Sequence, residues 1–270
     1  MHCSQRIMMI LLFLCSFLSA CTSIVTTENN LGLLWRQASG EYRAVCLQTY
    51  KQALEAVRQY DPASASKPPA IVADLDETVL DNGRFHAYSR ISGRPFSQER
   101  WDEWVRESVD PTRAYRVGAV PGAVDFINAV LGMEKGITMV YVSNRNDYQL
   151  EDSQKALRLI GVRNVEQAVF LLKSPGMKTK QSRYREVASR YEIIAMLGDS
   201  LGDFMGEIDP ATGESEEVTG DNPERYQARW GNQWFMIPNP VYGSWTQPFA
   251  GENAAKDFFL TQCAEKCLNH

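Results

Sequence analysis

Residues 70–82 read AIVADLDETVLDN, a short apolar run that leads directly into two carboxylates separated by one residue. The run contains small and β-branched residues without polar alternation, which is typical of a parallel strand covered on both faces. Open α/β sheets bind ligands beyond the carboxyl ends of their strands. The segment therefore predicts a buried strand that delivers Asp74 and Asp76 to an active site. The alternative is an Asp-rich turn that only caps the following helix.

The two carboxylates flank Leu75, so they project from the same side of an extended backbone. One of them can attack phosphorus while the other handles the proton of the leaving group. A divalent cation would hold them together, and Mg²⁺ prefers carboxylates, waters and substrate phosphate as ligands. The pattern thus favours phosphoryl chemistry with Mg²⁺ as cofactor.

A second apolar run, ITMVYV at residues 137–142, ends in Ser143, Asn144 and Arg145. A hydroxyl and successive backbone amides at the end of a strand can cradle a phosphate. Taken alone, the same residues would also suit an ordinary turn.

A third run, residues 191–197, ends in GDSLGDF, which places Asp199 and Asp203 in a glycine-flanked turn. Between the second and third runs, KTKQSR at residues 178–183 opens a helical pattern. A lysine there can neutralise a phosphate or brace the nucleophile, although lysines on helices are usually only solvated. The order of the four segments carries more information than any one of them.

In that order, the segments resemble the four motifs of the haloacid dehalogenase (HAD) phosphatase superfamily. More closely, the chain resembles the class C bacterial acid phosphatases of subfamily IIIB, which are lipoprotein nucleotidases of the outer membrane. The matching segments are DLDETVLDN, the pair Trp101 and Trp104, AVPGAVDF from Ala119, VSNR from Val142, GDSLGDF from Gly198 and MIPNPVYGSW from Met236. The resemblance runs from about Glu41 to the C-terminal end. It implies a three-layer α/β fold, with a HAD-like (Rossmannoid) parallel sheet, helices on both faces and a small, mostly helical cap inserted at about residues 82–118.

The resemblance also implies roles for the acidic residues. Asp74 would be the nucleophile that forms an aspartyl-phosphate, and Asp76 the acid and base. Asp74, the backbone carbonyl of Asp76, and Asp199 would coordinate Mg²⁺. Asp203 would support the water shell of the metal.

The remaining polar residues would bind the phosphate and the substrate. In the resembled family, a serine at the position of Ser143 hydrogen-bonds a phosphoryl oxygen, and Asn144 and Arg145 would be substrate-binding neighbours. Lys180 fits the family's K-x-x-R pattern better than Lys178 does, so Lys180 would bind phosphate and Asp74.

Aromatic side chains outside the motifs are expected to select the substrate. Trp101 and Tyr242 occupy positions that, in the resembled family, stack on a nucleobase or an aromatic leaving group, although plain core packing is the alternative. Trp104 and Trp245 are expected in the core. His86 is expected to be partly exposed, with a place at the substrate entrance as the alternative.

The N-terminus has the pattern of a secretory signal, with Arg6 before an apolar stretch at residues 7–18. The following LSAC resembles a lipobox, which implies a signal peptide at residues 1–20 and lipidation of Cys21. An ordinary signal peptide with an incidental cysteine is the alternative. The resemblance favours a lipid-anchored protein of the bacterial cell envelope, in the outer membrane, with a tether at 21–30 and the phosphatase domain at 31–270.

The net charge limits the macromolecules that the protein can bind, and the cysteine content limits the disulfides that it can form. The formal charge is −5 for the whole chain and −6 without Arg6, which argues against nucleic acid as a partner. Three cysteines remain after Cys21, and Cys46 is expected either to bridge to Cys263 or Cys267 or to stay buried and unpaired. A homo-oligomer stays possible.

Two further segments carry structural expectations. Residues 33–57 are expected to form one helix, which would pack on the core through apolar positions that include Leu34 and Val45. Residues 209–222 are expected to form a mobile surface loop.

The leading hypothesis is a Mg²⁺-dependent phosphomonoesterase that hydrolyses nucleoside monophosphates and aryl phosphates outside the cytoplasm. One alternative is a lipoprotein that keeps the fold and binds haem or a nucleotide without catalysis. Another is a phosphotransferase that passes the phosphoryl group to an alcohol through the same site.

Overall fold

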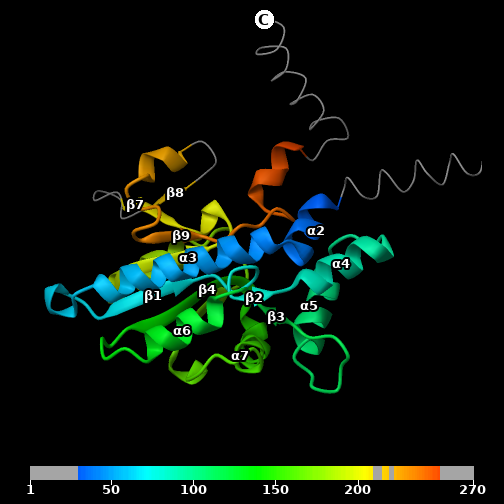
Figure 1. The fold of residues 1–270 in the computed structure, drawn as a ribbon, viewed down its shortest axis with the longest axis horizontal. Coiled ribbons are helices and arrows are strands. Elements are labelled where there is room, and N and C mark those ends of the chain that lie inside the picture. Colours follow the sequence, from blue (N-terminus) through cyan, green and yellow to red (C-terminus); the bar gives the residue numbers. More distant parts are fainter. Residues whose placement is uncertain (1–29, 209–214, 219–221, 250–270) are drawn as a thin grey trace, which may run out of the picture.

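The computed structural model describes residues 30–208, 215–218 and 222–249 (Figure 1). Its helices are α2 (Leu31–Ala38), α3 (Gly40–Gln59), α4 (Gly83–Ser92), α5 (Gln98–Glu107), α6 (Ala123–Leu131), α7 (Leu150–Leu159) and α8 (Gln181–Arg190). Its strands are β1 (Pro69–Ala73), β2 (Leu80–Asp81), β3 (Gly118–Ala119), β4 (Thr138–Asn146), β5 (Val169–Lys173), β6 (Glu192–Gly198), β7 (Met205–Ile208), β8 (Ser215–Glu217) and β9 (Trp234–Met236). Short 3₁₀ turns, including η4 (Leu201–Asp203) and η6 (Ser244–Phe249), connect them.

A five-stranded parallel sheet with the order β5-β4-β1-β6-β9 forms the centre of the molecule. The strand that directly precedes Asp74, β1, is the middle one, and Val72 pairs with Val140 on one side and Met196 on the other. The three predicted strands are confirmed as β1, β4 and β6. The strands β5 and β9, which flank them, were not predicted.

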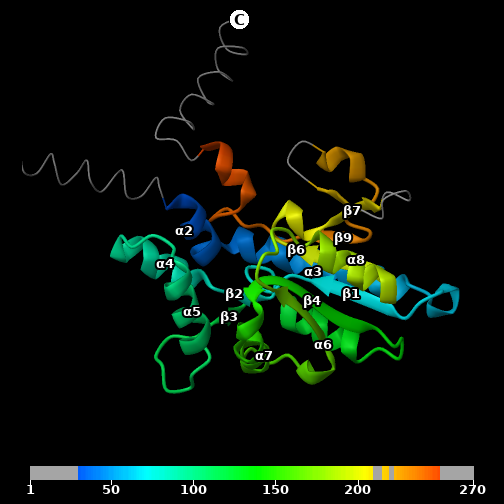
Figure 2. The ribbon, with the colours of Figure 1, turned by 180° about the vertical axis from the view of Figure 1, so that it is seen from behind.

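Alternate residues of β1 face different layers of helices. Ile71 and Ala73 belong to a buried cluster with α3 and α6, whereas Ala70 and Val72 belong to a second cluster with α8. The helices α3 and α6 are seen in Figure 1, and α8 is seen from behind in Figure 2. The predicted three-layer α/β fold is therefore confirmed.

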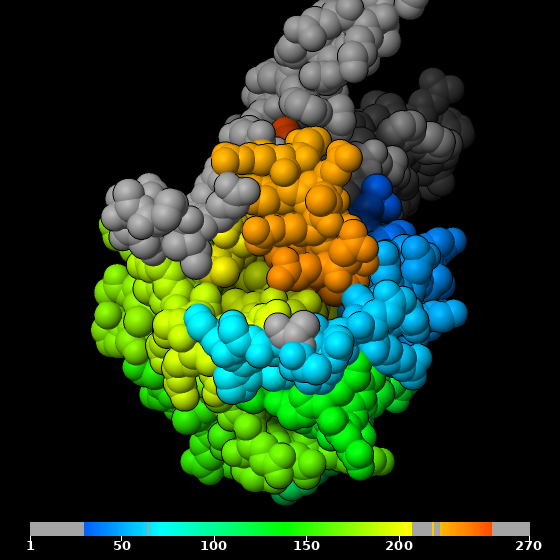
Figure 3. Space-filling model, turned by 90° about the vertical axis from the view of Figure 1, so that its left-hand side faces the viewer, coloured from blue at the N-terminus to red at the C-terminus, as the bar shows by residue number. Residues whose placement is uncertain are grey.

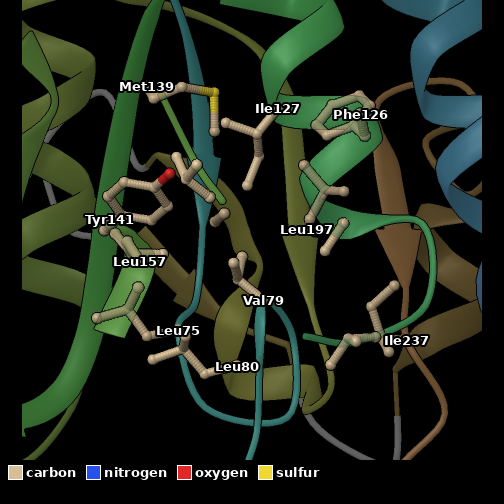
Figure 4. Close-up of a cluster of buried hydrophobic side chains, with 14 of the residues drawn as sticks. Leu75, Val79, Leu80, Phe126, Ile127, Met139, Tyr141, Leu157, Leu197 and Ile237 are labelled. Carbon is tan, nitrogen blue, oxygen red and sulfur yellow. The ribbon is translucent and has the colours of Figure 1, made fainter. Parts of the chain in front are cut away.

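The chain that follows β1 is fixed by the core on the α3 side. Leu75, Val79 and Leu80 are all buried in this cluster, beside Tyr141 and Leu157 (Figure 4). Burying a leucine contributes about 1.5–3 kcal/mol to folding. The loop that carries the predicted catalytic carboxylates is thus held by its apolar residues, which leaves the acidic ones free for other contacts.

The helices α4 and α5 lie at the carboxyl end of the sheet, within the stretch that was predicted to be a cap (Figure 1). Val120 and Leu80 pack in the core next to the small β2–β3 ladder, where the chain leaves for α4 and later returns. Figure 3 shows the opposite end of the molecule, where the connection from α3 to β1 is drawn largely in light blue and cyan. The site predicted from the motifs therefore faces α4 and α5 and lies far from this connection.

The prediction of one helix over residues 33–57 is wrong. Ser39 has an extended conformation, with φ −78° and ψ 145°, and its side chain accepts a hydrogen bond from the backbone N–H of Tyr42 at 3.0 Å. This N-cap ends α2 and starts α3 on a new register. Leu34 and Val45 are consequently 49% and 41% exposed. The buried positions of the two helices are Leu33, Arg36, Tyr42, Cys46, Tyr50, Ala53 and Val57.

The prediction for residues 209–222 is wrong in part, because Ser215–Glu217 form a strand that pairs with β7. The remainder of that stretch lies largely outside the described residues, as do the signal peptide, the tether, Cys21, Cys263 and Cys267. Cys46 is fully buried. Among the residues that the structure describes, no helix is both long and apolar enough to cross a bilayer.

Candidate active site

A cavity of 1010 Å³ opens at the carboxyl ends of β1, β4 and β6. All the predicted catalytic, metal-binding and substrate-binding residues of the domain line it. They are Asp74, Asp76, Trp101, Ser143, Asn144, Arg145, Lys180, Asp199, Asp203 and Tyr242. The fold therefore brings together residues that are spread over about 170 positions of the sequence.

Lys180 connects two of the acids. Its ammonium lies 2.7 Å from a carboxylate oxygen of Asp74 and 2.6 Å from one of Asp203. Burial lowers the pKa of Lys180, but the two carboxylates outweigh it and raise that pKa, so the lysine stays charged. Lys178 is exposed, and no ion pair to it is observed in the described part of the chain. Both lysines line the cavity, but it is Lys180 that contacts Asp74 and Asp203.

The positive charge of Lys180 does not fully compensate the negative charges at and around Asp74. Burial raises its pKa to about 7, and the neighbouring Asp203 and Asp76 add to the effect, while Lys180 opposes it. A carboxylate in this state is stabilised by any further cation that comes close.

Asp74, Asp199 and Asp203 form the acidic cluster of the site, since one carboxylate oxygen from each lies within 4.8 Å of the others. Asp199 is held by the hydroxyl of Thr78 at 3.0 Å and by the amide of Asn239 at 2.8 Å. Burial and the nearby carboxylates raise the pKa of Asp199 well above its usual range. An all-oxygen set with excess negative charge fits Mg²⁺, which takes carboxylates and water rather than nitrogen or sulfur ligands.

Asp203 supports the loop that presents Asp199. Its second carboxylate oxygen accepts hydrogen bonds from the backbone N–H groups of Asp199 at 3.1 Å and Ser200 at 2.9 Å. Gly198 permits this turn, because a Cβ atom at that position would lie 2.2 Å from the Cβ atom of Asp203. Glycine is therefore required there by close approach.

Asp76 is oriented by a separate set of groups. Arg145 donates from Nε to both its oxygens at 3.1 and 3.0 Å and from Nη2 at 2.8 Å, and Asn82 donates at 2.9 Å. The indole of Trp104 in turn donates to Asn82 at 2.7 Å. The guanidinium carbon of Arg145 lies 5.8 Å from the ring centroid of Trp101. Arg145, predicted as a substrate contact, is nearly fully buried and has Asp76 as its principal partner.

Ser143 and Asn144 are positioned by an arginine that the sequence analysis did not single out as a site residue. Arg183 donates to the backbone carbonyl of Ser143 and, at 2.9 Å, to the side chain of Asn144. It also donates to the carbonyl of Leu171 at 3.2 Å, which ties β5 to the end of β4. Arg183 is the arginine of the K-x-x-R pattern that begins at Lys180, so the signal was present in the sequence.

Glu77, the residue after Asp76, carries a buried carboxylate that was not predicted to belong to the site. It is fully buried and has a positive φ of 60°. Arg36 of α2 pairs with it at 3.1 Å, Tyr242 donates its hydroxyl to it, and His86 lies 3.7 Å away. Burial raises the pKa of Glu77, but Arg36 and the other partners outweigh this and lower it to about 2. An arginine on the apolar face of α2 was the available signal, because a buried guanidinium needs an acidic partner.

Of the two tryptophans predicted to lie in the core, one is buried and the other is not. Trp104 is buried, as expected, whereas Trp245 is 52% exposed and the prediction that it lies in the core is wrong. Trp101 and Tyr242 both line the cavity. His86 is half-buried, as expected, and it also lines the cavity, where its ring packs on that of Tyr242 with centroids 4.8 Å apart.

Comparison with known proteins agrees with this geometry. A family model described as HAD superfamily, subfamily IIIB (Acid phosphatase) matches residues 21–245. The structure is similar to that of the class C acid phosphatase from Bacillus anthracis, with 30% sequence identity and a TM-score of 0.71, over 88% of this chain and 96% of that one. A structure of the class C acid phosphatase from Bacillus anthracis with tungstate bound matches with the same values. The resemblance read from the motifs is thereby confirmed.

Proposed function

This chain belongs to the acid phosphatases of the HAD superfamily, subfamily IIIB, and is a phosphomonoester hydrolase; we propose that it uses Mg²⁺ and an aspartyl-phosphate intermediate to hydrolyse nucleoside monophosphates and aryl phosphates. The observation that carries the proposal is the separation of two neighbouring carboxylates into different environments. Asp74 lies in the acidic cluster with Lys180, whereas Asp76 is held by Arg145. One acid is thus available for attack and the other for proton transfer.

Asp74 and Asp199 are the side chains that would hold the metal, and Asp203 would support its water shell. The raised pKa values of Asp74 and Asp199 reflect a need for added positive charge, which supports the assignment. The backbone carbonyl of Asp76 is the additional ligand that the family resemblance implies. When bound, Mg²⁺ would neutralise the carboxylates and charge on the transferred phosphoryl group.

In the first step, a carboxylate oxygen of Asp74 attacks phosphorus and the bond from phosphorus to the ester oxygen breaks. Asp76 gives a proton to that leaving oxygen, so the alcohol departs neutral. In the second step, Asp76 takes a proton from water as the water oxygen attacks phosphorus, and phosphate leaves Asp74. Ser143 and Lys180 would bind the phosphoryl oxygens, because stabilising charge on these oxygens is the main task in phosphoryl transfer.

The cavity supports substrates with an aromatic leaving group. It is far larger than a phosphate ion needs, and Trp101 and Tyr242 supply aromatic surface on its wall. Stacking of a base on such rings contributes about 1–3 kcal/mol and tolerates many ring systems. The similar structure has tungstate bound, an oxyanion that resembles phosphate, which supports phosphoryl binding by this fold.

For location, we propose a lipid anchor at Cys21 in the bacterial outer membrane. The signal-like segment and the LSAC sequence support it. Outside the cytoplasm the enzyme would release nucleosides from charged nucleotides that do not cross membranes readily. Small phosphomonoesters, and not nucleic acids, would be its partners.

The test is phosphate release by the mature protein from several nucleoside monophosphates and an aryl phosphate, with Mg²⁺, with EDTA, and with the Asp74→Asn variant. We expect release that needs the metal and is lost in the variant. Substantial release by the variant would exclude the proposed nucleophile. Products that carry the phosphoryl group on an added alcohol would indicate phosphotransfer, and ligand binding without release would indicate a binding lipoprotein.

A further inference from the structure

Glu77 lies in the sequence between Asp76 and Thr78, which both contact residues of the active site, but its own side chain has other partners. Asp76 meets Arg145, and Thr78 donates its hydroxyl to Asp199. Glu77 has a positive φ, which among the described non-glycine residues is shared only with Asn164. L-residues rarely adopt this left-handed conformation, and where they do the surrounding contacts usually impose it. The side chain of Glu77 is thereby separated from the metal cluster.

The two oxygens of Glu77 have distinct partners. The first, Oε1, is fixed to the body of the protein by Arg36 at 3.1 Å and by the backbone N–H of Asn82 at 3.0 Å. Arg36 is itself held by Asp81 at 3.1 Å. The second, Oε2, accepts the hydroxyl of Tyr242 and lies 3.7 Å from Nε2 of His86. Glu77 therefore connects the body of the protein to two rings of the cavity wall.

The two rings are held differently, because the Tyr242 hydroxyl is bound by Glu77, whereas the His86 ring lies on α4 and also packs edge-on against Phe85 with centroids 5.4 Å apart. Tyr242 lies on the loop between β9 and η6 and is 37% exposed, next to Gly243, whose φ is +145°. Its ring packs against His86 with centroids 4.8 Å apart and planes tilted by 37°. Both rings line the cavity above the catalytic carboxylates. A loop residue of this kind takes its position from the hydrogen bond at its end.

We infer that Glu77 is a specificity-determining positioning residue, which holds Tyr242 and His86 as an aromatic wall and so favours phosphate esters whose leaving group carries a flat ring. The inference rests on the proposed function and adds to it the residue that sets ring selectivity. Glu77 would not contact the reacting atoms. Its loss should weaken the binding of ring-bearing ligands more than it slows hydrolysis.

The experiment is a double-mutant cycle with Glu77→Gln, Tyr242→Phe and the double variant. Tyr242→Phe keeps the ring and removes only the hydroxyl. Tyr88→Phe is the matched control, since Tyr88 is an exposed tyrosine of α4 that does not line the cavity. The readouts are the affinity for adenosine by calorimetry and the kcat and KM for adenosine monophosphate and for glycerol phosphate, which has no ring.

We expect each single variant to weaken adenosine binding roughly tenfold, as for loss of a hydrogen bond to a charged group. The double variant should lose little more than either single one, because both act on the same contact. KM for adenosine monophosphate should rise more than kcat falls, with a smaller change for glycerol phosphate.

Unchanged adenosine affinity in Tyr242→Phe, or fully additive losses in the double variant, would overturn the inference. Equal losses of kcat on both esters would also overturn it, since they would mean that Glu77 serves the catalytic loop as a whole. If Glu77→Gln does not fold, Arg36→Lys takes its place in the cycle. Failure of the wild-type protein to release phosphate would count against the proposed function alone, because adenosine binding is measured without turnover.

Discussion

Asp74 and Glu77 are three residues apart and both are enclosed by protein, yet their environments push them in opposite directions. The pKa of Asp74 is raised to about 7 and that of Glu77 is lowered to about 2. Asp74 shares a single lysine with Asp203, whereas Glu77, which shares Arg36 with Asp81, also accepts hydrogen bonds from a hydroxyl and a backbone N–H. The difference teaches that Glu77 is electrostatically complete, while the cluster around Asp74 is built to receive a further positive charge.

The strongest test of this comparison is to remove the carboxylate of Glu77, whose charge is already compensated by its neighbours. Glu77→Ala leaves Arg36 buried beside only Asp81, and breaking a buried ion pair in this way costs about 3–5 kcal/mol. Chemical denaturation of the metal-free protein should show a loss of this size. A loss below 1 kcal/mol would mean that the pair contributes little beyond what solvent replaces.

The pH dependence of metal-free stability should follow Asp74 rather than Glu77 above pH 4. Because the folded state raises the pKa of Asp74, the protonated acid favours folding, and this stability is present below about pH 4. It is lost as the pH rises toward 7. Denaturation at several pH values in EDTA should show a decline of a few kcal/mol over this range. A rise over the same range would contradict the environment described for Asp74.

Asp74→Asn should act in the opposite sense to Glu77→Ala. The amide removes a buried charge from among other carboxylates, so the metal-free variant should be more stable at neutral pH by about 2 kcal/mol. It should also flatten the pH dependence above. Added Mg²⁺ should stabilise the wild-type protein more than the variant, and equal stabilisation would exclude Asp74 as a ligand.

The smallest expected effect concerns the support of Asp76. Trp104→Phe keeps a ring in the core but removes the donor to Asn82, which costs about 1 kcal/mol. Thermal unfolding and kcat measured together would check it. A fall in kcat beside this small loss of stability would show that Asn82 needs the indole to hold Asp76, and an unchanged kcat would contradict that role.

The sequence predicted those parts of the site that follow strands, because a strand that ends in an acid places that acid at the edge of the sheet. Asp74, Asp199 and Ser143 were located in this way. Glu77 was not, since its partner Arg36 is 41 residues away and meets it only through the packing of α2. The single-helix prediction failed for a related reason. A serine N-cap at position 39 outweighed a continuous apolar pattern and turned Leu34 outward.

The position of Arg36 on α2 gives the first helix an importance beyond packing. If the protein is anchored at Cys21, a protease that cuts the chain before Leu31 would release a molecule in which Arg36 still neutralises Glu77. A cut at the junction between α2 and α3 would remove that arginine and leave Glu77 buried beside the catalytic loop without its cation. Only a cut on the N-terminal side of α2 would therefore release a molecule that keeps the Arg36–Glu77 pair.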